Sequence, residues 1–187
     1  MMDYLKTIER AAEEIKAAAA GADPKAISRL AKEIAKAKKI VLHGVGREGL
    51  MMRALAMRLY HMGLDAHVAG DMSAPPVGRG DLLIVSAGPG HFATIEALVG
   101  IATEAGARTA CVTAQPKGKV PRTCHTVLTI PAQTMANDNA SKAASVLPMG
   151  SLYEGAQYLT FEVLILMLRD QLKVPPSAMR KRHTNLE

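Results

Sequence analysis

The stretch Lys39-Ile-Val-Leu-His-Gly-Val-Gly-Arg-Glu-Gly49 joins a short β-branched run, a glycine-rich turn and the start of a helical pattern. A second stretch of the same kind occurs at Asp81-Leu-Leu-Ile-Val-Ser-Ala-Gly-Pro-Gly-His91. Strands that alternate with helices pair in parallel, because each crossover returns the chain to the same end of the sheet. The two stretches therefore predict an α/β protein with glycine turns at the carboxyl ends of its strands.

The rest of the chain continues this alternation. Strands are predicted at 39–43, 66–69, 81–86, 108–113 and 127–131, and helices at 3–19, 24–38, 50–62, 91–105 and 151–172. The first helix carries apolar residues at helical spacing, namely Leu5, Ile8, Ala12, Ile15 and Ala19. In a flavodoxin-like strand order of 2-1-3-4-5 the first and third strands are neighbours, so both glycine turns line one crevice.

Length and composition indicate one globular domain over residues 1–187, with 49% hydrophobic and 21% charged residues. We divide it into N-terminal helices (1–38), an α/β core (39–172) and a C-terminal tail (173–187). The apolar runs are interrupted or too short for a membrane span, and the first residues are amphipathic rather than a signal peptide. We therefore expect a cytoplasmic protein without a membrane partner.

Charge and residue types narrow the partners further. A formal net charge of +6 suits an anionic ligand, but with no Trp and 3% aromatic residues there is no stacking platform for single-stranded nucleic acid. Cys111 and Cys124 lack zinc spacing and are interpreted as reduced cysteines. The histidines also lack metal spacing, so we expect neither a nucleic-acid partner nor a metal.

The first glycine turn, Gly44–Gly49, matches G-x-G-x-x-G, and Asp65 and Asp71 lie near the spacing of a ribose-binding acid. A dinucleotide site is one interpretation, although two helices precede the strand and little chain remains for a catalytic domain. A sugar phosphate is favoured, because glycines let backbone N–H groups approach an anion at a helix start. A tight turn without a ligand is the third alternative.

The second turn repeats this geometry and adds the Ser86 hydroxyl. The candidate substrate contacts are Gly44, Gly46, Arg47 and Gly49 in the first turn and Ser86, Gly88 and Gly90 in the second. Ser145 is a further candidate contact in the Pro/Gly-containing segment that precedes the last long helix.

Glu154 lies in the first turn of that long apolar helix, where an acid or base can face a site. The spacing of Ser151 and Glu154 also matches S-x-x-E, a capping box in which the glutamate bonds back to the helix start. Spacing alone favours neither role. His61, at a helix end, is favoured by its surroundings as a packed residue, and His183 in the basic tail by itself indicates a solvated one.

Several segments together resemble the 6-phospho-3-hexuloisomerases of the sugar isomerase (SIS) domain class. They are the two leading helices, the Gly-Val-Gly-Arg turn at 44–47, Ala56-Met-Arg-Leu-Tyr-His-Met-Gly63, Leu147-Pro-Met-Gly-Ser-Leu-Tyr-Glu154 and Arg182-His-Thr-Asn-Leu-Glu187. The resemblance implies a three-layer α/β sandwich with a five-stranded parallel sheet, a homotetramer and no cofactor. It also implies interconversion of 3-hexulose 6-phosphate and fructose 6-phosphate.

In that reaction Glu154 is the candidate base, and the resemblance favours this role over the cap. His61 and His183 are the candidates for moving protons on the substrate oxygens, because the pKa of histidine lies near neutrality. His183 could act in a neighbouring subunit. The alternative function is a binding module that senses a phosphosugar without converting it.

The chain departs from the family at its two glycine turns. Glu48 stands where a serine is usual, and a carboxylate there repels phosphate unless it turns away or pairs with a base such as Arg47 or Arg53. The second turn, Ser86–His91, lacks a second hydroxyl. These departures leave open a divergent phosphosugar, or a polyol without phosphate, as the substrate.

Overall fold

The protein contains a five-stranded, all-parallel sheet in the order β2-β1-β3-β4-β5, which confirms the predicted fold and strand order. The computed structural model describes residues 3–138 and 145–186. The strands are β1 (Ile40–His43), β2 (Ala66–Val68), β3 (Leu82–Ser86), β4 (Arg108–Thr113) and β5 (Thr126–Thr129). In register, Leu42 of β1 lies beside Ile84 of β3, so these two strands end next to each other.

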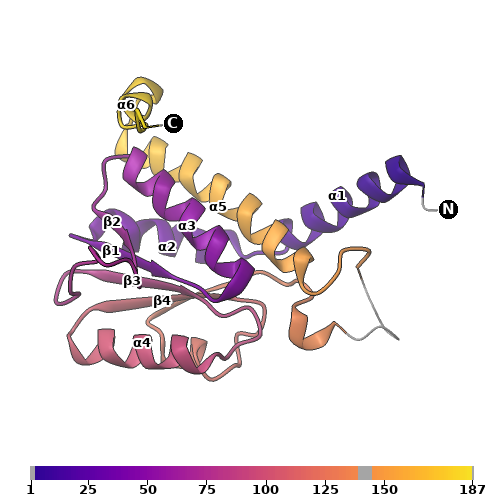
Figure 1. The fold of residues 1–187 in the computed structure, drawn as a ribbon, viewed down its shortest axis with the longest axis horizontal. Helices are drawn as coiled ribbons and strands as arrows, with labels where there is room; N and C mark the ends of the chain where they lie inside the picture. Colours follow the sequence, from indigo (N-terminus) through magenta and orange to yellow (C-terminus); the bar gives the residue numbers. More distant parts are fainter. Residues whose placement is uncertain (1–2, 139–144, 187) are drawn as a thin grey trace.

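Helices cover both faces of the sheet, as Figure 1 shows. They are α1 (Tyr4–Ala20), α2 (Pro24–Lys36), α3 (Gly46–His61), α4 (Ala93–Glu104), α5 (Ser151–Leu172) and α6 (Pro176–Lys181), with the 3-10 helices η1 (Pro121–Thr123) and η2 (Met135–Asn137). Helices α2, α3 and α5 pack on one face, and α4 packs on the other. The protein therefore has three layers.

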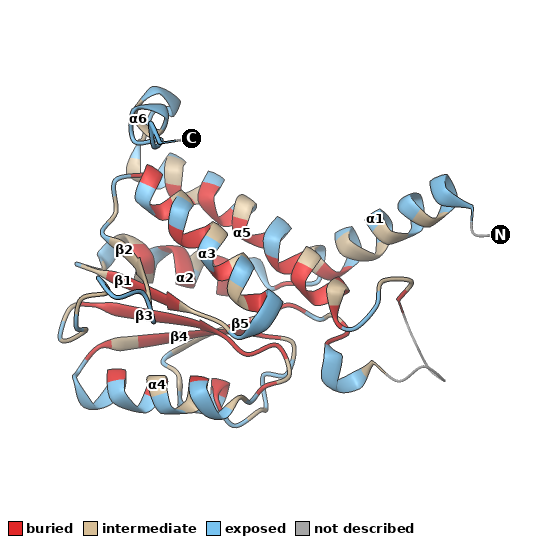
Figure 2. Ribbon diagram, in the orientation of Figure 1, coloured by how far each residue is buried: buried red, intermediate tan, exposed pale blue. Residues whose placement is uncertain are grey.

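The two buried clusters follow from the alternation of side chains along each strand. Leu82 and Ile84 of β3 face the cluster of α2, α3 and α5, whereas Leu83 and Val85 face the cluster of α4. Because successive strand residues point to opposite faces, a strand covered on both sides is apolar throughout. All five residues of β3 are buried, as Figure 2 shows for the centre of the sheet.

The largest differences from the predicted helices are the start of α3 and the additional helix α6. Helix α3 begins at Gly46 rather than near residue 50, because the glycine turn itself forms its first turn, with Gly46 at a φ of 57°. Helix α6 occupies part of the predicted tail, and Pro176 at its first position suits a helix start.

Helix α1 leaves the body of the protein along half of its length (Figure 1). Ile15 packs against Gly155 of α5, but Leu5 and Ile8 of the predicted apolar face are 68% and 47% exposed. The helical periodicity is therefore correct, while its first half has no apolar partner within the described chain.

None of the helices in the described ranges has both the length and the apolar character that a membrane span requires.

The close approach of Gly44 and Gly49 makes a prediction about stability. A β-carbon on Gly49 would lie 2.6 Å from the Gly44 carbonyl oxygen, so Gly49→Ala forces the turn apart and is expected to reduce the free energy of unfolding by roughly 1–3 kcal/mol. Gly100→Ala is the matched control, because nothing lies within 4 Å of its added carbon in α4. That control is expected to stabilise by roughly 0.5–1 kcal/mol. Urea unfolding measures both, and equal effects would contradict the contact.

Candidate active site

A pocket of about 330 Å³ lies at the carboxyl ends of the neighbouring strands β1 and β3. Four segments line it: the start of α3 (residues 45–48), the second glycine turn (Pro89 and Phe92), the segment at Thr134 and Met135, and residues 148–154 around the start of α5. Ligands of open parallel sheets bind at such a position, where the strand order reverses. The predicted crevice between the two turns is therefore present.

Glu154 reaches this pocket from the first turn of α5 and is only 9% exposed. The helix begins after Gly150, whose φ of 83° suits glycine, and no side chain caps it. The capping-box interpretation of Glu154 is therefore wrong. Its carboxylate instead accepts a hydrogen bond from the Arg47 guanidinium, which also lies 3.5 Å from the Ser151 hydroxyl.

Glu48 lies beside Glu154 in the pocket lining and turns toward the second glycine turn. Its Oε2 atom accepts hydrogen bonds from the Ser86 hydroxyl at 2.5 Å and from the Gly88 N–H at 2.9 Å. Neither expected arginine pairs with it, because Arg47 binds Glu154 and Arg53 binds Asp71 at 3.1 Å. Glu48 therefore neither turns away from the site nor gains a basic partner.

The environment of Glu48 opposes its ionisation. Burial raises the pKa of the Glu48 carboxyl, the hydrogen bonds from Ser86 and Gly88 oppose this rise, and the charge of Glu154 adds to it. Burial also raises the pKa of Tyr153 well above its usual range, and the charge of Glu48 contributes in the same direction. Tyr153 therefore keeps its proton in the lining of the pocket.

Sequence reasoning missed Tyr153 and Gln157, which lie on either side of Glu154 in the chain and are buried in α5. Gln157 Nε2 donates to Ser86 Oγ at 2.9 Å, and the Tyr153 hydroxyl lies 3.4 Å from the same oxygen. The available signal was the spacing of four residues between Tyr153 and Gln157, which places them on one helix face beside Glu154.

The remaining candidate contacts divide into two groups. Gly46 and Arg47 line the pocket, whereas Gly44, Gly49, Ser86, Gly88 and Gly90 shape the turns behind its lining residues. Ser145 lies outside the lining, where its hydroxyl donates to Glu14 of α1 at 2.6 Å. That bond ties the segment before α5 to the first helix.

The two histidine candidates contact each other instead of Glu154. The His61 and His183 rings stack with centroids 5.4 Å apart, and Arg182 donates to the His61 carbonyl at 3.2 Å. This histidine cluster (His61, Arg182 and His183) lies at the end of α3, whereas Glu154 lies near its start. The sixteen residues of α3 span about 24 Å, and most of this length lies between the two groups within one chain.

The acids of the dinucleotide interpretation have other partners. Asp65 lies 2.7 Å from the His67 ring, Asp71 binds Arg53, and neither carboxylate lines the pocket. Within residues 3–138 and 145–186, no group of three or more His, Cys, Asp or Glu side chains could hold a metal ion.

A doubly wound parallel sheet with a carboxylate-lined pocket at the switch point defines a class of α/β proteins that bind small ligands at the carboxyl ends of their strands. The SIS domain model matches residues 33–156. The chain is 34% identical to the 3-hexulose-6-phosphate isomerase of Mycobacterium gastri, over 99% of this chain and 92% of that one. It is 31% identical to the 3-hexulose-6-phosphate isomerase of Bacillus subtilis (strain 168), over 98% and 100%. The chain belongs to the SIS domain family.

A crystal structure of a hypothetical protein from Methanococcus jannaschii has the same fold. Its TM-score is 0.83 at 24% identity, and the match covers 97% of this chain and 99% of that one. The molecular function inferred for that protein is 3-hexulose-6-phosphate isomerase.

The raised pKa of Glu48 predicts a pH-dependent stability. The contribution of Glu48 is fully present below its pKa in the unfolded chain and is lost as pH rises through its raised folded pKa. The glutamine of Glu48→Gln cannot ionise. The free energy of unfolding of this variant, relative to that of the wild type, is therefore expected to rise between pH 4 and pH 8. Each unit of raised pKa corresponds to about 1.4 kcal/mol. Urea unfolding across this range measures the difference.

Glu96→Gln is the matched control, because His91 and Lys119 hold the pKa of the Glu96 carboxyl below its usual range. The contribution of Glu96 to stability is present above its pKa in the unfolded chain and is lost as pH falls. The free energy of unfolding of Glu96→Gln, relative to that of the wild type, is therefore expected to fall as pH rises. A pH-independent difference for Glu48→Gln would contradict the role of burial.

Proposed function

We propose that this protein is a sugar-phosphate isomerase that interconverts 3-hexulose 6-phosphate and fructose 6-phosphate. The observation that carries the proposal is the Glu154 carboxylate, which is nearly buried, faces the pocket and contacts the Arg47 guanidinium. The two isomerases of known name that match nearly the whole chain support the choice of substrate pair.

The reaction moves a carbonyl group from carbon 3 to carbon 2 and needs a base between them. In the proposed mechanism Glu154 removes the proton from carbon 2, and the electron pair forms an enediolate across carbons 2 and 3. Proton transfer between the two oxygens follows, and Glu154 returns its proton to carbon 3. Atoms and electrons balance without an oxidant, a reductant or a cofactor.

The oxygen protons need a second group, and we propose the histidine cluster of another copy of the chain. Within one chain, α3 separates His61 and His183 from Glu154. A neighbouring copy that brings its cluster to this pocket would complete the acid–base set. This arrangement makes the active enzyme a homo-oligomer, and we propose the tetramer that the family resemblance implies.

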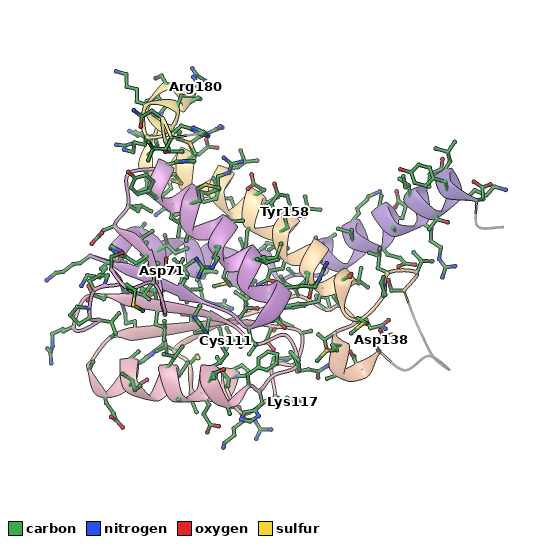
Figure 3. The ribbon with its side chains drawn as sticks, viewed as in Figure 1. Asp71, Cys111, Lys117, Asp138, Tyr158 and Arg180 are labelled. Atoms are coloured by element: carbon green, nitrogen blue, oxygen red, sulfur yellow. The ribbon has the colours of Figure 1, made fainter. Side chains whose placement is uncertain are left out.

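Exposed apolar side chains support an assembly of copies. Leu159, Val163 and Leu166 follow the i, i+4, i+7 spacing of one helix face on α5, and all three are at least 39% exposed. Figure 3 shows Tyr158 on the side of the same helix that faces away from the sheet. Helix α3, packed beside α5, adds Leu50, Met57 and Tyr60. A surface of this kind favours a protein partner.

Two further aspects follow from this function. A sugar phosphate is an intracellular metabolite, so the proposal locates the reaction in the cytoplasm. The position of Glu154 favours catalysis over the alternative of a sensor module, because a binding protein has no need of a nearly buried base in its pocket.

Glu154→Gln is expected to abolish the exchange of substrate protons with solvent while the fold persists. Glutamine keeps the size of the side chain but cannot accept the carbon-bound proton, so a loss of roughly 10²- to 10⁴-fold follows. Proton NMR of fructose 6-phosphate in D₂O measures the exchange. Glu162→Gln is the matched control on the same helix, because Glu162 binds Arg58 at 3.3 Å outside the pocket. A loss of less than tenfold in the proton-exchange rate of Glu154→Gln would contradict the role of Glu154 as the base.

Mixed oligomers test the shared site. Glu154→Gln and His183→Ala are each expected to be inactive, whereas refolding them together restores activity at about a quarter of the sites, those that combine an intact glutamate with an intact histidine. The isomerase rate of the mixture measures this. An inactive mixture would contradict a site that combines Glu154 of one copy with His183 of another.

A further inference from the structure

Glu48 fills a position where two hydrogen-bond donors converge on one carboxylate oxygen, and a third donor orients one of them. Ser86 Oγ and Gly88 N–H both donate to its Oε2 atom, at 2.5 and 2.9 Å. Gln157 donates to Ser86 Oγ at 2.9 Å, so the single proton of the serine is directed to Glu48. We call Ser86, Gly88 and Gln157 the anion cradle.

The carboxylate also occupies the space of the anion cradle. A β-carbon built on Gly88 would lie 2.7 Å from Glu48 Oε1 and 2.8 Å from the Tyr153 ring, so the group sits directly over the glycine. Ser86 is fully buried and Gly88 does not line the pocket, whereas Glu48 and Tyr153, which contact both, do line it. A ligand that enters the pocket meets Glu48 before it meets the cradle.

Within residues 3–138 and 145–186, the charges around the pocket give phosphate no compensation at this position. The charged lining residues in these ranges are Arg47, Glu48 and Glu154, and the Arg47 guanidinium is already bound to Glu154. Backbone and hydroxyl donors at the start of a helix bind an external anion when they are free. Here the chain supplies that anion itself.

We propose that Glu48 is a specificity-determining residue that occupies the anion cradle and excludes phosphate from it. The substrate end that meets Glu48 is then an uncharged polyol end, whose hydroxyl groups donate to the carboxylate. This inference rests on the proposed function, since it concerns how a sugar lies in the same pocket. In the proposed reaction the phosphate end lies on the open side, where the Arg47 side chain is 66% exposed.

Inorganic phosphate is the probe, because its binding affinity reports on the anion cradle and it is not converted by the enzyme. Calorimetric titration of the full-length protein compares the wild type with Glu48→Ser and Glu48→Gln. Serine vacates the cradle, so phosphate is expected to bind at least about tenfold more tightly. Glutamine removes the charge but still fills the cradle and accepts its hydrogen bonds, so it is expected to gain less than threefold over the wild type.

Two controls accompany these variants. Glu96→Ser changes the net charge equally and also lies in the first turn of a helix, but outside the pocket, so its phosphate affinity is expected to match that of the wild type. Thermal melting confirms that each variant folds. Fructose, which carries no phosphate, is expected to bind Glu48→Ser more weakly than the wild type, because an acceptor for its hydroxyls is lost.

Equal phosphate affinity in the wild type and Glu48→Ser would overturn the proposal. An equal gain in affinity in Glu48→Gln and Glu48→Ser would also overturn it, because the charge of Glu48, and not its occupancy of the cradle, would then determine phosphate binding. The outcome is independent of the isomerase test. Tighter phosphate binding in Glu48→Ser without any proton exchange in the wild type would uphold this inference and reject the proposed function. Proton exchange with equal phosphate affinities would do the reverse.

Discussion

The hydrogen bonds that end on Glu48 Oε2 join the carboxyl ends of two neighbouring strands. Glu48 follows β1, while Ser86 and Gly88 belong to the end of β3. A buried carboxylate needs such donors, because an unpaired charge in the interior is costly. The close contact of Gly44 with Gly49 directs the chain so that Glu48 can reach them. These hydrogen bonds hold the two glycine turns together, and the floor of the pocket depends on them.

The same network separates two carboxylates that share one pocket. Glu154 binds the exposed Arg47 side chain, whereas Glu48 is buried among neutral donors and its pKa is raised. Neighbouring acids with different environments take different chemical roles. The proposed roles differ accordingly: Glu154 is the proposed base at the reacting carbons, and Glu48 is the proposed acceptor that decides which end of a sugar enters.

The long helices connect the site to the proposed assembly of copies. Helix α3 starts at the pocket and ends at the histidine cluster, so a single chain holds the two parts of the proposed acid–base set at opposite ends of this helix. Apolar side chains remain exposed on α3, on α5 and on the first half of α1. Burial of these surfaces by further copies would both stabilise the protein and bring complementary halves together.

The sequence by itself determined the parallel sheet, its strand order, the crevice between the two glycine turns and the position of Glu154, because hydrophobic periodicity and turn residues are local signals. Only the tertiary structure decided what those side chains contact. In the structure Glu154 pairs with Arg47 and does not cap its helix, Glu48 accepts hydrogen bonds from Ser86 and Gly88, and Ser145 donates to Glu14. The tertiary structure also separated His61 from Glu154. Partners distant in the chain are chosen by packing and burial, which no local pattern records.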